Sequence, residues 1–206
     1  MAKLLNLLRR DNAQSWEVQK NDIYLLSDIA WHYDALDRNE EALKYIKRVV
    51  RLGRDDAWIN EEYGACLSGL GKYKEAIKKY EYALNLDDEN KDEAYINSQL
   101  GWCHRLLGDY EKALECYIKS KEEGRNDPWI NVEIAMCYEN LGDYEKALDY
   151  ALIAYDLDRD DIRSLSEVGW IYDCMDKYED GLPFLLRAEE LGRDDEWLNS
   201  ELGFEL

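Results

Sequence analysis

The chain has 206 residues and a formal net charge of −20 at pH 7. Such an excess of negative charge is repelled by nucleic acid and by anionic membrane surfaces, so we expect direct binding to neither. Five cysteines in no paired spacing, an N-terminal stretch that turns polar by Arg9 and no apolar run near the roughly 18 residues of a membrane span predict a reduced, cytoplasmic protein.

The first 22 residues fit no repeating pattern. They hold a short apolar stretch at Leu4, Leu5 and Leu8, and a segment around Trp16. Repeat proteins need a terminal unit that covers the end of the stack. We therefore expect residues 1–22 to form an N-terminal capping segment.

From residue 23 onward one motif recurs. It consists of a small residue, usually an aromatic residue two places on, and then Ala or Gly near the start of a second helix. This Ala or Gly falls at positions 42, 76, 113, 147 and 181, so the spacings are 34, 37, 34 and 34. A period near 34 predicts stacked pairs of helices. Two prolines and no strand-like alternation also favour an all-α fold. The predicted repeats cover 23–56, 57–90, 94–127, 128–161 and 162–195, followed by a partial sixth repeat or capping helix at 196–206.

Within each repeat we number the places from 1, so that the marker Ala or Gly stands at place 20. Places 7 and 8 of the first helix hold a large residue and then Gly or Ala, and Ala at place 20 is followed by an aromatic residue at place 24 in two repeats. The residues are Ile29-Ala30, Tyr63-Gly64, Leu100-Gly101, Ile134-Ala135, Val168-Gly169, Ala76 with Tyr80, and Ala113 with Tyr117. This pattern resembles the tetratricopeptide repeat family. The resemblance implies a right-handed α-solenoid of antiparallel helix pairs, a superhelix.

Two departures indicate a divergent subfamily. The Trp usual at place 4 is replaced by Asn60, Asn97, Asn131 and Asn199. The Pro usual at the end of a repeat is replaced by a Gly-Arg-Asp-Asp turn or a relative of it, at 53–56, 124–127 and 192–195. The aspartates that end these turns are expected to cap the next helix.

The first helix of each repeat lines the concave face in tetratricopeptide arrays, so the resemblance implies which residues bind a partner. Places 2, 9 and 12 supply mainly aromatic side chains, with a few charged ones. They are Tyr24, Trp58, Tyr95, Trp129, Arg163 and Trp197 at place 2, Trp31, Trp102, Met136 and Trp170 at place 9, and Arg105 and Glu139 at place 12. Trp and Tyr dominate binding hot spots. The alternative is that the rings pack between neighbouring first helices, and both can hold at once.

The charge of two other places bears on the partner. Place 6 is acidic or an amide throughout, at Asp28, Glu62, Gln99, Glu133, Glu167 and Glu201. Such a row suits a Lys- or Arg-rich ligand, or is simply a solvated face. The Lys, Asn and Arg residues with which related co-chaperones hold a C-terminal carboxylate are absent from places 5, 9 and 13, so a clamp for an acidic tail is not expected.

Catalytic patterns are weak. His32 and His104 are the only histidines, and adjacent helical residues such as Cys103 and His104 face about 100° apart. The acids at 156, 158, 160 and 167 match four positions of a calcium loop, but Asp161 stands where that loop needs Gly. We expect no catalytic residue, no cofactor and no metal.

The sequence therefore predicts a non-enzymatic scaffold that binds a protein or peptide, more basic than acidic, through an aromatic-lined concave face. One alternative is an acidic inhibitor or nucleic-acid mimic of the anti-defence type, which blocks the basic groove of a nucleic-acid-binding enzyme. The observation behind this alternative is the net charge of −20. A second alternative is an interaction domain of a larger regulatory protein. Self-association through the C-terminal end is left open.

Overall fold

The structure is a computed structural model that describes residues 22–89 and 91–192. These residues form ten α-helices and no strand, which confirms the all-α prediction. The chain divides into two compact units, residues 1–91 and residues 92–206. Trp197, the predicted partial repeat 196–206 and nearly all of the predicted capping segment 1–22 lie outside the described residues, so these assignments and the repeat boundaries stay predictions.

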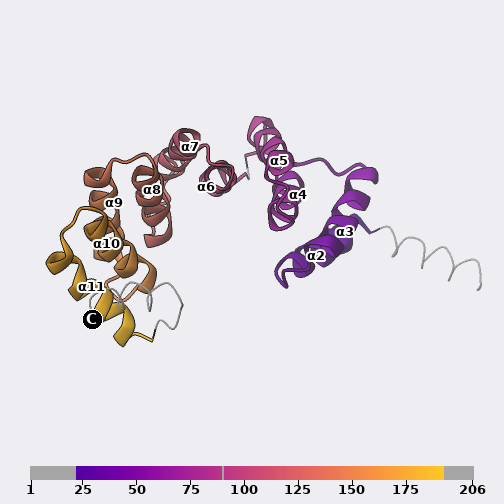
Figure 1. The fold of residues 1–206 in the computed structure, drawn as a ribbon. Coiled ribbons are helices and arrows are strands. Elements are labelled where there is room, and N and C mark those ends of the chain that lie inside the picture. Colours follow the sequence, from indigo (N-terminus) through magenta and orange to yellow (C-terminus); the bar gives the residue numbers. More distant parts are fainter. Residues whose placement is uncertain (1–21, 90, 193–206) are drawn as a thin grey trace, which may run out of the picture. The chain divides into compact units, whose positions relative to one another are not determined.

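The first unit contains two antiparallel helix pairs (Figure 1). Helix α2 packs against α3, and α4 packs against α5, while α3 and α2 both contact α4. The helices are α2 (Ile23–Asp34), α3 (Asn39–Arg51), α4 (Ala57–Gly69) and α5 (Tyr73–Asn85).

The second unit contains three such pairs, α6 with α7, α8 with α9 and α10 with α11 (Figure 1). The first helices of successive pairs also touch, because α6 contacts α8 and α8 contacts α10. In each unit we call the surface formed by the first helices the A-helix face. The helices are α6 (Glu93–Leu106), α7 (Tyr110–Glu122), α8 (Pro128–Asn140), α9 (Tyr144–Leu157), α10 (Ile162–Cys174) and α11 (Tyr178–Glu190).

Local sequence explains where these helices begin and end. The Asp127 carboxylate accepts the Ile130 N–H at 2.9 Å, and Pro128 fills the first helical position, where its missing N–H costs nothing. Gly108 has a φ of 79° just past the end of α6, a left-handed conformation that glycine adopts without steric cost. Asp37 and Asp176 take the same conformation in the two repeats that lack this glycine.

The two helices of a pair approach closely because sizes at places 8 and 24 are matched. A Cβ atom added at Gly64 would lie 2.7 Å from the Tyr80 ring, and one at Gly101 would lie 2.6 Å from the Tyr117 ring. Both rings are fully buried. Where place 8 is alanine instead, as at Ala30 and Ala135, place 24 holds the smaller Ile46 and Ala151. Close-packed interiors tolerate only such complementary pairs.

We therefore predict that Gly64→Ala lowers the free energy of unfolding by about 1–3 kcal/mol, because the Tyr80 ring cannot move aside in a packed core. Urea denaturation measures the loss. The double variant Gly64→Ala/Tyr80→Ile copies the first repeat and should be more stable than the sum of the two single losses predicts. Strictly additive losses would contradict the size-matching argument.

Candidate functional site

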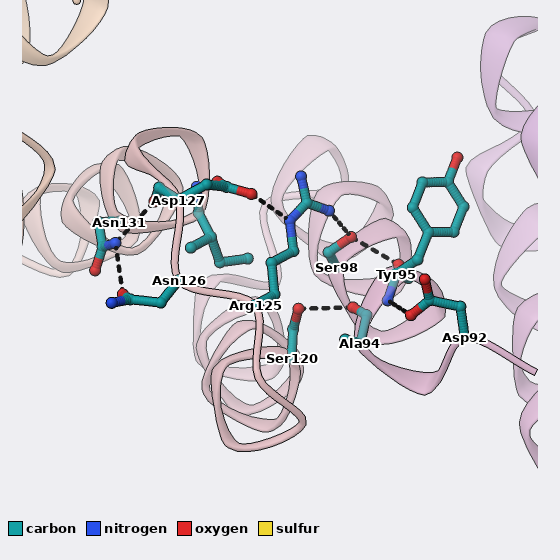
Figure 2. Close-up of polar contacts among 10 residues, drawn as sticks. Asp92, Ala94, Tyr95, Ser98, Ser120, Arg125, Asn126, Asp127 and Asn131 are labelled. Carbon is teal, nitrogen blue, oxygen red and sulfur yellow. Dashed lines mark hydrogen bonds and ion pairs between the residues drawn. The ribbon is translucent and has the colours of Figure 1, made fainter. Parts of the chain in front are cut away.

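The Gly-Arg turns tie neighbouring first helices together. In the second unit, Arg125 Nε donates to Asp127 Oδ2 at 2.8 Å, and its Nη1 donates to Ser98 Oγ at 2.6 Å (Figure 2). The same guanidinium lies over the Trp129 ring, 4.6 Å from its centroid. Arg125 thus links α6 to the N-terminus of α8 and covers one face of an indole that was predicted to bind a partner.

The first unit repeats this arrangement. Arg54 Nε donates to Asp56 Oδ2 at 2.7 Å, its Nη1 donates to Ser27 Oγ at 2.8 Å, and its guanidinium lies 4.7 Å from the centroid of the Trp58 ring. The same guanidinium lies 5.6 Å from the Tyr24 ring. The Arg turn is therefore a recurring structural device and explains why Trp follows it in the sequence.

The asparagine at place 4 belongs to the same device. Asn131 is fully buried; its Nδ2 donates to Asn126 Oδ1 at 3.1 Å and to the Asp127 carbonyl at 2.8 Å, and its Oδ1 accepts from Lys121 Nζ at 2.5 Å (Figure 2 shows the first two bonds). In the first unit Asn60 Nδ2 makes the two equivalent bonds, to Asp55 Oδ1 and to the Asp56 carbonyl, and its Oδ1 accepts from Lys79 of the following helix α5. The two departures from the usual repeat pattern are thus coupled, since the turn needs the amide.

A buried carboxylate joins all three first helices of the second unit. Glu133 in α8 has no solvent exposure. Its Oε2 accepts from Arg105 Nε at 2.6 Å and from Tyr117 Oη at 2.9 Å, and its Oε1 pairs with Arg163 Nη2. An unpaired carboxylate here would carry a large desolvation penalty, which the two guanidiniums offset.

This network brings together most of the site residues predicted in the second unit. The Arg105 guanidinium lies 4.7 Å from the centroid of the Trp102 ring, and the Trp102 and Trp129 centroids are 6.2 Å apart. Arg163 Nη2 contacts Met136 Sδ at 3.5 Å. A second group lies beside it, because Trp170 Nε1 in α10 donates to Glu139 Oε1 in α8 at 3.0 Å. The residues so connected are Trp102, Arg105, Trp129, Met136, Arg163, Glu139 and Trp170.

The other predicted residues are less engaged. Tyr95 is half-buried at the start of α6, where its N–H bonds to Asp92 (Figure 2). In the first unit, Tyr24 is 75% exposed and Trp31 is 49% exposed, while Trp58 is half-buried. The rings of Trp102 and Trp129 are half-buried. Packing and an open face therefore coexist at these indoles.

The acidic row at place 6 is not a solvated face at two of its positions. Glu62 and Glu133 are buried, and Glu133 pairs with arginines of the chain itself. The solvated-face interpretation was therefore wrong for these two residues. The signal missed in the sequence is that place 6 of one repeat meets place 12 of the repeat before it, which for Glu133 is Arg105.

Two segments of the chain match models of a known repeat family. Residues 55–122 and residues 130–161 each match a family model described as tetratricopeptide repeat. These two segments are similar to tetratricopeptide repeats. Proteins built from tetratricopeptide repeats are generally non-enzymatic scaffolds that bind proteins or peptides. No curated protein matches the chain significantly.

Solved structures share the tetratricopeptide fold. MamA from Desulfovibrio magneticus RS-1, residue 41 to the end, has a TM-score of 0.73 and 21% identity, over 84% of this chain and 97% of that one. YrrB, described as a TPR protein with an unusual peptide-binding site, has a TM-score of 0.69 and 22% identity, over 93% of this chain and 96% of that one. At these identities the similarity establishes an array of antiparallel helix pairs and nothing further.

None of the helices in residues 22–89 and 91–192 combines the length and hydrophobicity needed to cross a membrane. Within the same residues, no group of three or more His, Cys, Asp or Glu side chains is placed to hold a metal ion. Asp161, which stands where a calcium loop needs Gly, caps α10 by accepting the Ser164 N–H at 2.9 Å.

We predict that Arg125→Lys lowers the free energy of unfolding by about 1–3 kcal/mol, because an ammonium cannot reproduce the fork that binds Asp127 and Ser98 together. The matched control is Arg187→Lys, which alters an exposed ion pair with Asp160 and should cost clearly less than Arg125→Lys. Urea denaturation of both variants decides the matter, and equal losses would show that the Arg turn contributes no more than a surface pair.

The second unit also predicts a pH dependence. Burial, and then the neighbouring Glu139, raise the pKa of Glu167 to about 8 from its ordinary value near 4.5. The folded state therefore keeps this proton while the unfolded chain loses it, so stability is full below about pH 4.5 and declines as the pH rises towards 8. Glu167→Gln should remove that decline. Between pH 5 and 8.5 its free energy of unfolding should therefore rise relative to that of the wild type by on the order of a few kcal/mol.

Urea denaturation at pH 5, 6, 7 and 8.5 measures this gain. Glu145→Gln, at an exposed position at the start of α9, is the control and should differ from the wild type by a constant amount. A constant difference for Glu167→Gln as well would mean that Glu167 titrates normally in the folded protein.

Proposed function

We propose that this protein is a non-enzymatic scaffold that binds a protein or peptide on the A-helix face. The observation that carries the proposal is the Trp102–Trp129 pair, which is half-buried and held by arginines. One indole rests against Arg105 and the other against Arg125. Tryptophan and arginine are the side chains most enriched at binding hot spots.

Rigidity supports this role. The Trp129 ring contacts Tyr117 edge to face with centroids 6.1 Å apart, and Tyr117 in turn bonds to Glu133. A side chain that is already fixed loses little conformational entropy when a ligand covers its exposed face. The aromatic pair is therefore pre-organised for contact with a partner.

The charges of this face favour a basic partner over an acidic tail. The guanidinium N–H groups of Arg105 and Arg125 are directed at Glu133, Asp127 and Ser98. Each of these two guanidiniums is already paired with a carboxylate of the chain. Glu139 is half-buried, and the chain as a whole carries a net charge of −20. A cationic partner is attracted by that field at low salt.

The inhibitor alternative receives no support from the A-helix face. The observation behind this alternative is the net charge of −20. A mimic of nucleic acid presents regularly spaced anions, whereas this face carries Arg54, Arg105 and Arg125 beside aromatic rings. It also carries Arg163 beside Met136. We therefore retain the scaffold as the proposed function.

The test is selection of binders from a random peptide display library against the immobilised wild-type protein, followed by affinity measurement with the enriched peptides. Trp102→Ala and Trp129→Ala should each weaken binding at least about tenfold, the loss expected at a hot spot. Tyr178→Ala, at a ring that is 50% exposed on the second helix α11, is the control and should bind like the wild type. Circular dichroism checks that each variant is folded.

Two outcomes would overturn the proposal. One is a selection that enriches no peptide over a blank surface. The other is a set of enriched peptides whose affinities are the same for the two folded Trp variants as for the wild type.

A further inference from the structure

Three contacts between first helices can be compared side by side. They are the contacts of α2 with α4, α6 with α8, and α8 with α10. In each, the residue at place 12 of one repeat interacts with the residue at place 6 of the next, by a bond at Arg105 and electrostatically at Asp34 and Glu139. The residue pairs are Asp34 with Glu62, Arg105 with Glu133, and Glu139 with Glu167. Place 6 is Glu in all three, but place 12 is a cation in one and an acid in the other two.

The pair Arg105–Glu133 shows what a carboxylate at place 6 requires. Glu133 is fully buried and has two guanidiniums and the Tyr117 hydroxyl as partners. Every one of these partners offsets the loss of solvation. This contact is therefore complete within the chain.

The other two contacts lack these partners. Glu62 is 8% exposed, and its Oε2 is buried with no hydrogen-bond partner among the described residues. Glu167 Oε1 is likewise buried without a partner in that part of the chain. Place 24 of the preceding repeat, which gives Glu133 the Tyr117 hydroxyl, holds Ile46 or Ala151 instead. The donors that serve Glu133 are thus replaced by alkyl groups and by a second acid.

The charged groups around each pair leave a negative site. Glu62 faces Asp34 from α2, with Glu61 on its own helix. Glu167 faces Glu139 and Glu133 from α8, Arg105 from α6 and Arg163 on its own helix, and the two arginines already share Glu133. Burial, followed by the neighbouring acid, raises the pKa of Glu62 to about 7 and that of Glu167 to about 8.

The pairs open on the A-helix face. Asp34 and Glu139, the place-12 members, are half-buried and so remain in contact with solvent. Trp170 Nε1 donates to Glu139 Oε1 and fixes that carboxylate beside an indole ring. An indole next to a carboxylate can receive the flat face of a guanidinium or the alkyl stem of a lysine.

We propose that each acid pair, Asp34–Glu62 and Glu139–Glu167, binds a Lys or Arg side chain of the partner. That side chain supplies from outside the cation that Arg105 supplies to Glu133 within the chain. The proposal rests on the proposed function, because it assumes that the partner lies on the A-helix face. It adds the partner's chemistry: basic side chains at the acid pairs.

Proton release follows from this arrangement. A cation bound at the pair favours the charged carboxylates, so it lowers the pKa of Glu62 and of Glu167. Near pH 7 binding therefore expels a proton, and affinity for a basic side chain rises as the pH increases from 6 to 8.5.

The experiment measures the pKa values of these two glutamates directly, by ¹³C NMR of the side-chain carboxyl groups in the full chain. Glu62→Gln and Glu167→Gln assign the signals. The probe is N-acetylarginine amide, with N-acetyllysine amide as a second probe and NaCl at equal ionic strength as the control. Either probe should lower both pKa values by at least half a unit more than NaCl does, and should leave the Glu133 signal unchanged. Shifts no larger than those given by NaCl would overturn the proposal.

A charge-reversed variant tests whether the side chain at place 12 reaches Glu167. Glu139→Arg copies the pair Arg105–Glu133, so the new guanidinium should lower the pKa of Glu167 below neutral and abolish the effect of the probes at that site. Glu167 still titrating near pH 8 in this variant would mean that place 12 does not reach it, and would overturn the assignment. The effect at Asp34–Glu62 should persist and serves as the control.

These measurements separate the two proposals. Probe binding at the acid pairs together with a failed peptide selection would leave the cation sites standing and remove the proposed function. Selected peptides that bind through Trp102 and Trp129 but show no enrichment of Lys or Arg would leave the proposed function standing and remove the cation sites.

Discussion

Arginine side chains that bridge neighbouring first helices are the contacts on which the A-helix face depends. Arg54 and Arg125 each join the serine of one first helix to the aspartate that caps the next. Arg105 and Arg163 converge on one buried glutamate from both sides. Burying charge is unfavourable unless every group is paired, so these contacts fix the relative positions of the helices that they join.

The aromatic side chains take their orientation from the same arginines. A guanidinium lies over the ring of each of three indoles, Trp58, Trp102 and Trp129. A fixed indole with an accessible part is suited to recognition, because binding it costs little entropy. The structural role and the proposed binding role of these residues therefore do not compete.

Much of the fold could be predicted from the sequence, because it depends on contacts within a repeat. The marker residues at 42, 76, 113, 147 and 181 and the small residue at place 8 report the packing of one helix pair. The charges of the A-helix face were harder to interpret, because they depend on contacts between repeats. Glu133 meets Arg105, 28 residues earlier, and Arg163, 30 residues later. Only a comparison of place 6 with places 12 and 2 of neighbouring repeats could have shown that this acid is neutralised and that Glu167 is not.

The central claim, that a partner occupies the A-helix face, is tested most directly by the indole N–H signals in a ¹H–¹⁵N NMR spectrum recorded with and without a selected peptide. The account predicts that the signals of Trp102, Trp129 and Trp170 shift or broaden on binding, with the backbone amides of α6, α8 and α10. Unchanged indole signals, together with shifts confined to the second helices α7, α9 and α11, would contradict it.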